Sequence, residues 1–234
     1  MLVGDGRVHA LQRHLDRLAH SIGALYGRRL APGVGDRLRA EAAGLTGEHR
    51  LRVDVVPGED IAISTGPVAA GYRRPVTLEP FVVPGGLGPH KWRDRRLLDI
   101  ATRYRGAISG REPVGRTAIS GREPAAPLLL DSDGTVLEAA WGNVWLLEGD
   151  ALVTPPADGR ILPGVTRALL LELAPSLGLR PREEPVSLHR LRAAPLTFAT
   201  SAIRLAVPAT LGGSAGAAPA SAIVDRLRTA LAAH

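Results

Sequence analysis

The stretch "ILPGVTRALLLELA", residues 161–174, sets the first constraint on the fold. Pro163 and Gly164 predict a turn, and the apolar residues after them predict a helix that begins at about Val165 and continues to residue 178. In such a helix the first backbone N–H groups, at Val165 and Thr166, have no partner, and with the Thr166 hydroxyl they can hold an anion such as a phosphate. Ordinary helix capping explains the same pattern, so both interpretations stay open.

A second chemical signal lies upstream, in "GPHKWRDRR", residues 88–96. The chain has 29 lysines and arginines together, and Lys91 is its only lysine. Both residue types supply positive charge, but only lysine readily loses its proton and attacks a carbonyl, as bonding to an aldehyde cofactor requires. Nearby basic side chains favour the neutral amine: His90, Arg93, Arg95 and Arg96. The alternative is that Lys91 merely survived a compositional bias toward arginine.

The third signal is Glu138, which stands in the nearly uncharged stretch "TVLEAAWGNVW", residues 135–145. A carboxylate in an apolar strand is rarely tolerated without a partner. A pyridine cofactor needs such a carboxylate opposite its ring nitrogen, to keep that nitrogen protonated. An exposed glutamate at a strand end is the alternative.

The composition fits a globular protein with a hydrophobic core. The chain has 234 residues, of which 45% are hydrophobic, and it has no cysteine, which excludes disulfides and thiolate chemistry. No apolar run is long enough to span a bilayer, and the start "MLVGDGRVHALQRH" has no signal-peptide core. We therefore expect a cytoplasmic protein that does not enter membranes.

The net charge of +6 raises the question of nucleic acid as a partner. The arginines are spread along the whole chain, however, and aromatic residues make up only 3% of it, which leaves few surfaces for base stacking. Small anionic ligands fit this distribution at least as well. We expect neither nucleic-acid binding nor a metal.

The periodicity of apolar residues predicts an α+β protein. Helices are expected from Val8 to Leu25, at 35–45, at 165–178 and at the C-terminus, and strands at 51–56, 60–65, 75–83, 126–131, 135–140, 143–148, 151–155 and 196–200. Glycine and proline at 84–89 predict a linker between two halves. We thus expect a smaller N-terminal α/β domain at 1–83 and a larger domain at 90–234. The exact repeat "AISGREP", at 107–113 and 118–124, indicates a duplication in a surface loop without a chemical role.

Taken in order, these signals resemble a known family, the class IV pyridoxal-phosphate aminotransferases. The resemblance is carried by "HLDRL" (14–18), "HKWRDR" (90–95), "LEAAWGNVW" (137–145), "LVTPPADGRILPGVTR" (152–167) and "TSAIRLAVPA" (200–209). It implies the fold-type-IV arrangement of D-amino acid aminotransferases, with pyridoxal 5′-phosphate near the domain boundary, a homodimer, and a small amino-acid-like substrate. The family commonly has a further strand containing "FET" before this point, so we expect the N-terminal domain to lack its first strand.

The resemblance also implies roles for individual residues. Lys91 looks like the lysine that binds the cofactor covalently and then moves protons, and Glu138 looks like the partner of the ring nitrogen. The remaining cofactor-binding positions are implied to be Arg17, Val165, Thr166 and Ser201 at the phosphate, and Asn143 in a supporting role near the cofactor.

Within the family, two stretches look most like the 4-amino-4-deoxychorismate lyases, which release pyruvate and the folate precursor 4-aminobenzoate. "KWRDR" is similar to their K-x-x-[ND]-R pattern, and "TSAIRLAVPA" is similar to their "TNSLRGVRPV". Arg204 is then a candidate for binding a substrate carboxylate, with a plain surface arginine as the alternative. Two other functions stay open: a branched-chain or D-amino acid aminotransferase, and a non-catalytic truncated paralogue.

Overall fold

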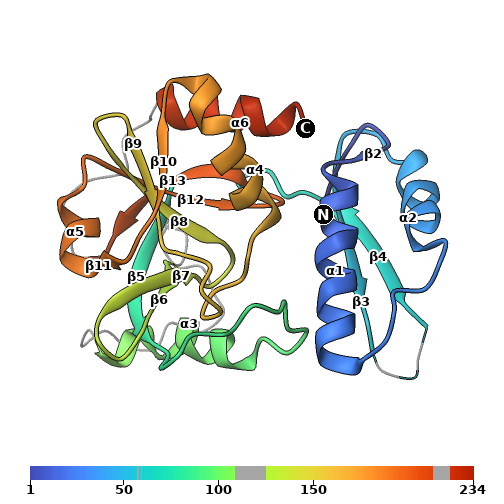
Figure 1. Ribbon diagram of the computed structural model, residues 1–234, viewed down its shortest axis with the longest axis horizontal. Helices are drawn as coiled ribbons and strands as arrows, with labels where there is room; N and C mark the ends of the chain where they lie inside the picture. The colour runs from blue at the N-terminus through green and yellow to red at the C-terminus, as the bar shows by residue number, and fades with distance from the viewer. Residues whose placement is uncertain (57, 59, 109–124, 213–221) are drawn as a thin grey trace.

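The computed structural model describes residues 1–56, 58, 60–108, 125–212 and 222–234. Within this part of the chain the strands form a four-stranded and a nine-stranded sheet, each with its own helices, and the two halves lie side by side (Figure 1). The duplicated "AISGREP" segment falls almost entirely outside the described residues. In the described part, no helix is both long and apolar enough to cross a membrane.

The smaller half is an antiparallel sheet covered by two helices. Its strands, in the order β2-β1-β3-β4, are β1 (Leu2–Gly4), β2 (Arg7–Val8), β3 (Glu48–Asp54) and β4 (Ala62–Pro67). Helices α1 (Leu11–Tyr26) and α2 (Val34–Ala43) pack on it through one apolar cluster that includes Val3, Leu38 and Leu51. Leu11 and Leu15 of α1 join this cluster, which places the next face of α1, with His14 and Arg17, toward the other half.

The larger half is built on a mixed sheet in the order β10-β9-β8-β12-β13-β5-β6-β7-β11. Its strands are β5 (Val76–Val82), β6 (Ala126–Leu130), β7 (Thr135–Ala139), β8 (Asn143–Glu148), β9 (Ala151–Thr154), β10 (Arg180–Glu183), β11 (Val186–Ser187), β12 (Leu196–Ser201) and β13 (Leu205–Leu211). Its helices are α3 (Arg96–Ile108), α4 (Val165–Leu173), the short 3₁₀ turn η1 (Ala174–Leu177), α5 (Leu188–Ala193) and α6 (Ala222–Ala232).

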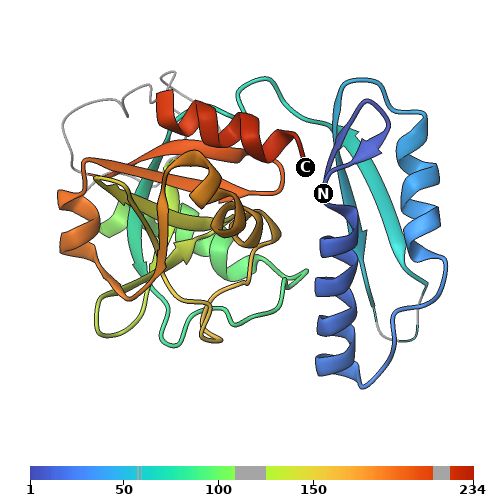
Figure 2. The same ribbon diagram turned by 45° about the horizontal axis from the view of Figure 1, so that its top comes forward.

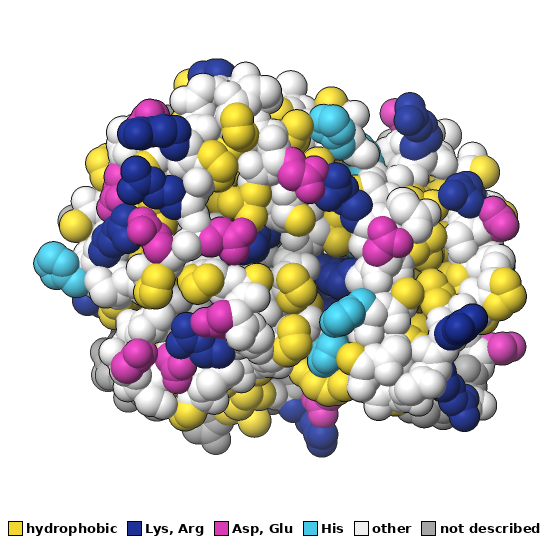
Figure 3. All heavy atoms as spheres, in the orientation of Figure 1, with side chains coloured by type: hydrophobic (Ala, Val, Ile, Leu, Met, Phe, Trp, Pro, Cys, Tyr) yellow, Lys and Arg dark blue, Asp and Glu magenta, His cyan; other side chains and the backbone are white. Residues whose placement is uncertain are grey.

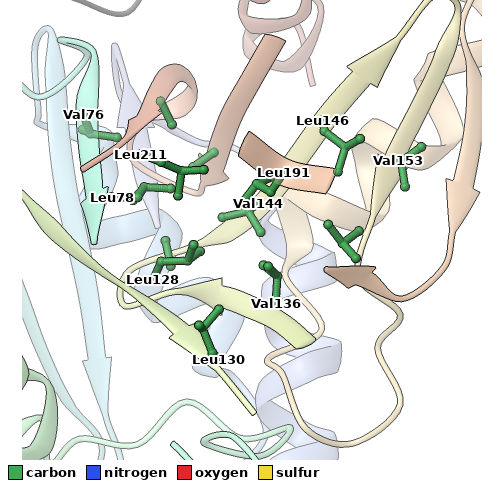
Figure 4. Packing of buried hydrophobic residues seen from close by; sticks show 14 of the residues in the cluster. Val76, Leu78, Leu128, Leu130, Val136, Val144, Leu146, Val153, Leu191 and Leu211 are labelled. Carbon is green, nitrogen blue, oxygen red and sulfur yellow. The ribbon is translucent and has the colours of Figure 1, made fainter. Parts of the chain in front are cut away.

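Two cores lie on opposite faces of this sheet, as alternation along a strand requires. Val144 and Leu146 of β8 point into one core (Figure 4). This core also contains Val153 of β9 and Val186 of β11, two strands that lie near opposite ends of the sheet. The sheet therefore curls around this core. Trp145 points the other way, stacks on Phe198 with ring centroids 5.9 Å apart, and packs under α4 and α6.

The structure corrects the predicted domain boundary. The strand at 75–83 was assigned to the smaller half, but β5 pairs in parallel with β13 and β6 in the large sheet. The chain therefore changes sheets between β4 and β5, and residues 84–89 connect β5 to the segment that carries Lys91. A strand rich in buried apolar residues fits either sheet by its pattern alone, so the prediction had no signal for its partners.

Contacts of α1 hold the two halves together. Arg13 of α1 pairs with Glu172 of α4 at 2.7 Å, and the Ala10 N–H donates to the carbonyl of His234 at 3.2 Å. Both chain ends lie at this junction (Figure 2). These contacts bring the helix that carries Arg17 against the half that carries Lys91.

Candidate active site

Lys91 lies in an irregular segment between β5 and α3, at the junction of the two halves. The segment is anchored on the large half, because Val83 and Leu98 pack with Leu129, Leu137 and Ile161 in a small apolar cluster. At Gly86 a Cβ atom would stand 2.1 Å from the carbonyl oxygen of Arg160, and the backbone there has a positive φ of 72°. Only glycine permits this close approach, which sets the path of the chain toward Lys91.

Lys91 borders a small cavity that opens to solvent and is also lined by Glu138, Trp141 and Leu162. The Lys91 side chain is exposed to solvent over part of its surface, but many protein atoms surround it. The resulting loss of hydration, followed by the nearby charges of Arg17 and Arg95, lowers the pKa of Lys91 from 10.5 to about 8, and Glu138 opposes this shift. The neutral, nucleophilic form is therefore accessible near neutral pH.

Glu138 is buried at the end of β7, with 6% of its surface exposed. Its Oε1 accepts a hydrogen bond from the Leu162 N–H at 3.2 Å, and its Oε2 lies 3.4 Å from Nδ2 of Asn143. Burial raises the pKa of Glu138 from 4.5 to about 7, against the Leu162 hydrogen bond and the positive charges of Lys91, Arg95 and Arg17. A carboxyl in this condition readily shares a proton with a basic ring nitrogen.

Asn143, at the start of β8, connects Glu138 to the loop before α4. Its Nδ2 also donates to the carbonyl of Leu162 at 3.0 Å. A Cβ at Gly164 would stand 2.1 Å from the Asn143 Oδ1, so glycine is required where this loop passes Asn143. Asn143 thus fixes both the Glu138 carboxylate and the loop before α4.

The N-terminus of α4 has the predicted form of an anion site. Gly164 precedes the helix in an extended conformation, and no side chain among the described residues caps it. Val165 and Thr166 are both buried, and the first backbone N–H groups of the helix lack intrahelical acceptors. Arg167 directs its guanidinium elsewhere, to the Pro155 carbonyl at 2.7 Å and to Glu183 at 2.8 Å.

Arg17 and Ser201 reach this region from different elements. Burial lowers the pKa of Arg17, its charge contributes to the pKa shifts of Lys91 and Glu138, and it therefore lies near both. Ser201 ends β12 directly beyond Thr200, which is paired with Asn143 of β8. Its Oγ accepts the Arg204 N–H at 3.2 Å.

Arg204 is held at the edge of the site by aromatic rings. Its guanidinium lies 4.5 Å from the Tyr72 ring centroid and 4.6 Å from that of Trp141, and its Nη1 donates to the Tyr72 carbonyl at 2.7 Å. Arg204 lines a second, more open hollow rather than the cavity of Lys91, and Trp141 and Arg95 border both. Figure 3 shows basic side chains and histidines in the depression between the two halves.

Sequence reasoning gave no binding role to two residues of this site, although it named Arg95 among the charges that favour a neutral Lys91. Arg95 donates from Nη2 to the Ala140 carbonyl and lies between the two cavities; its place four residues after Lys91 was the available signal. His14 is buried one helical turn from Arg17, and burial lowers its pKa well below 6.5, which keeps it neutral. Within the described residues, no cluster of three or more His, Cys, Asp or Glu side chains forms a metal site.

The architecture is similar to that of solved fold-type-IV proteins. A hypothetical aminotransferase from Mycobacterium tuberculosis, in its PLP-bound form, has a TM-score of 0.77 with 21% identity, over 99% of this chain and 86% of that one. A putative 4-amino-4-deoxychorismate lyase from Legionella pneumophila has the same TM-score with 19% identity, over 99% and 88%. The predicted α+β fold class is confirmed.

The family match follows from the sequence comparison. Residues 118–211 match the family model Amino-transferase class IV. A putative branched-chain-amino-acid aminotransferase from Methanocaldococcus jannaschii is 38% identical over 80 residues, which is 34% of this chain and 28% of that protein. The alignment thus spans little more than a quarter of this relative. The resemblance to class IV aminotransferases is confirmed, with the family match confined to residues 118–211.

Proposed function

We propose that this chain binds pyridoxal 5′-phosphate through Lys91 and acts as a 4-amino-4-deoxychorismate lyase. The observation that carries the cofactor proposal is the pairing of two shifted groups at one cavity: Lys91, with its pKa lowered to about 8, and buried Glu138, with its pKa raised to about 7. Opposite shifts in adjacent groups are typical of catalytic sites.

The residues present fit the ring nitrogen and the phosphate of this cofactor. Glu138, held by Leu162 and Asn143, is the partner for the ring nitrogen. The N-terminus of α4, with Val165 and Thr166, is the cradle for the phosphate, and Arg17 supplies a charge of the right sign. Ser201 is the proposed further phosphate ligand.

When bound, the cofactor supplies an electron-accepting ring that stabilises negative charge next to the amine of the substrate. The side chains of the protein move the protons and hold the cofactor in place. With a pKa of about 8, roughly a tenth of the Lys91 amine is neutral at pH 7, enough to attack and then to take and return protons at its Nζ. Glu138 keeps a proton on the ring nitrogen, and α4 and Arg17 hold the phosphate so that the ring keeps its orientation.

The second hollow favours the lyase over a branched-chain aminotransferase. Its wall carries Arg95 and Arg204 next to Asp99 and mainly apolar residues, and Trp141 borders both this hollow and the cavity of Lys91. Aminodeoxychorismate has two carboxylates, which suit guanidinium groups. A branched-chain amino acid has a single carboxylate, so it would engage only one of the two guanidinium groups. The aminotransferase stays the second candidate because the M. jannaschii relative carries that name.

A homodimer is part of the proposal, and the predicted cytoplasmic location stays a prediction. Large apolar side chains around α3 are exposed, with Val82 at 55% and Leu97 and Ile100 at 45% each. A contact between two copies would cover such a surface. Sedimentation at micromolar concentration is expected to give twice the monomer mass, and a monomer at all concentrations would contradict this part.

The reaction is tested with the purified, cofactor-loaded protein. Aminodeoxychorismate is supplied and the fluorescence of 4-aminobenzoate is followed; in parallel, leucine with 2-oxoglutarate is tested for transfer of the amino group. We expect 4-aminobenzoate and pyruvate in equal amounts, with little transfer from leucine. Transfer from leucine without 4-aminobenzoate would replace the lyase by the aminotransferase. If the protein binds the cofactor but shows neither activity, it is a non-catalytic paralogue.

A further inference from the structure

The residues on both sides of Lys91 are fixed by separate contacts. His90 Nδ1 lies 3.0 Å from the Oγ of Ser21 on α1, within hydrogen-bond distance. Trp92 donates from Nε1 to the carbonyl of Leu87 at 3.0 Å, which closes the segment on itself. The His90 ring also meets the Trp92 ring edge-on, with centroids 6.1 Å apart, and lies 6.2 Å from the His20 ring.

The Ser21–His90 contact joins the two halves of the molecule. Ser21 belongs to the helix of the small sheet, whereas the segment of His90 is anchored on the large half through Val83 and Leu98. Ser21 follows Arg17 by one turn of α1, so both lie on the same helix face. One hydrogen bond thus ties the lysine segment to the helix that carries the proposed phosphate ligand.

We propose that Ser21 and His90 are positioning residues, whose hydrogen bond keeps the Lys91 amine facing Arg17 and Glu138 across the junction of the two halves. The segment from β5 to α3 has no helix or strand of its own in the described residues 83–95, so its side contacts decide where the amine points. The role in catalysis rests on the proposed function, whereas the position of the amine does not.

The charged groups around the amine make its position measurable. Arg17 of α1, Arg95 of the same segment and Arg52 of β3 lower the pKa of Lys91, and Glu138 of β7 raises it, with loss of hydration as the largest cause. If the hydrogen bond is removed, the segment is free to swing away from α1, the amine regains water and leaves Arg17, and its pKa rises. A purely structural role would change stability and leave this value unchanged.

The experiment uses the protein without cofactor and exploits its single lysine. Trace acetylation as a function of pH, read by peptide mass spectrometry, gives the apparent pKa of Lys91 without interference from other side-chain amines. We expect Ser21→Ala to raise it by about half a pKa unit, a threefold loss of neutral amine at fixed pH. Ser21→Thr keeps the hydroxyl and is expected to match the wild type. So is Ser176→Ala, which removes an exposed hydroxyl bonded to the Leu173 carbonyl.

Substitutions at His90 test the same bond from its other side. His90→Phe keeps a ring but loses Nδ1, and is expected to reproduce the rise; His90→Asn removes the same titratable ring yet keeps a polar atom near the Nδ1 position, and is expected to show less. The double variant with Ser21→Ala should shift no further than either single one, because both remove one bond. If the pKa of Lys91 is unchanged in the single variants that fold, the proposal is overturned.

Borohydride trapping of pyridoxal phosphate on the wild type separates the two ideas. A rise in the Ser21→Ala variant without trapping in the wild type would support the positioning contact and contradict the proposed function. Trapping in the wild type with no change in the pKa of Lys91 in the variants would support the proposed function and contradict the positioning contact.

Discussion

Replacing Glu138 by glutamine is expected to make the protein without cofactor more stable at pH 8. Glu138 is almost fully buried, and its pKa rises on folding from 4.5 to about 7. At 1.36 kcal/mol per pKa unit, keeping this group ionised costs the folded state about 3 kcal/mol above pH 7. A glutamine amide pairs less well with Asn143 Nδ2, which lowers the free energy of unfolding by about 1 kcal/mol. The net gain in stability is then about 2 kcal/mol.

The pH dependence identifies the cause of this gain. A raised carboxyl pKa means that the folded state holds the proton more tightly than the unfolded state. Stability from Glu138 is therefore complete below pH 4.5 and is lost as pH rises through 7. Urea unfolding of both proteins at pH 8, 7 and 5.5, followed by circular dichroism, should show a difference that shrinks toward low pH. Equal stability at pH 8, or a difference independent of pH, would refute the reasoning.

Three further substitutions test other parts of the site. Arg17→Met should weaken the binding of pyridoxal phosphate about 10- to 100-fold, measured by absorbance titration. Pyridoxal has no phosphate, so its binding should stay nearly unchanged. Equal losses for both ligands would show that Arg17 does not bind the phosphate. Gly164→Ala forces a Cβ to within 2.1 Å of the Asn143 Oδ1 and should lower the free energy of unfolding, measured in urea, by about 1–3 kcal/mol. Gly44→Ala is the control, because a Cβ there has no neighbour within 4 Å, and it should have little effect. Similar losses in both variants would contradict the packing argument. Arg95→Met should raise KM for aminodeoxychorismate about tenfold with a smaller change in kcat, and a fall in kcat alone would place Arg95 in the chemistry instead.

Sequence reasoning found the polar residues of the site because their chemistry restricts their type. A nucleophilic amine must be lysine, and a carboxylate in an apolar strand needs a partner, so Lys91 and Glu138 were visible without a structure. The structure brings Lys91, Glu138, Asn143 and the N-terminus of α4 to the same junction. It places Arg204 apart from them, in the adjoining hollow.

The features that were missed depend on contacts between distant segments. Helix α3 was not predicted. In the part of it whose side chains are described, residues 96–102, only Leu98 and Ala101 are buried, while Leu97 and Ile100 face outward. The sheet that takes β5 is decided by pairing with β13, more than 120 residues later. The Ser21–His90 contact likewise joins residues 69 positions apart. Local periodicity carries no information about such partners.

The most direct test of the account is reduction with borohydride of the protein incubated with pyridoxal phosphate, followed by peptide mapping. We expect one pyridoxyl group per chain on the peptide that contains Lys91, with an absorbance band above 400 nm lost on reduction, and no incorporation in Lys91→Ala. A protein that remains unlabelled at Lys91 with excess cofactor would contradict the central claim.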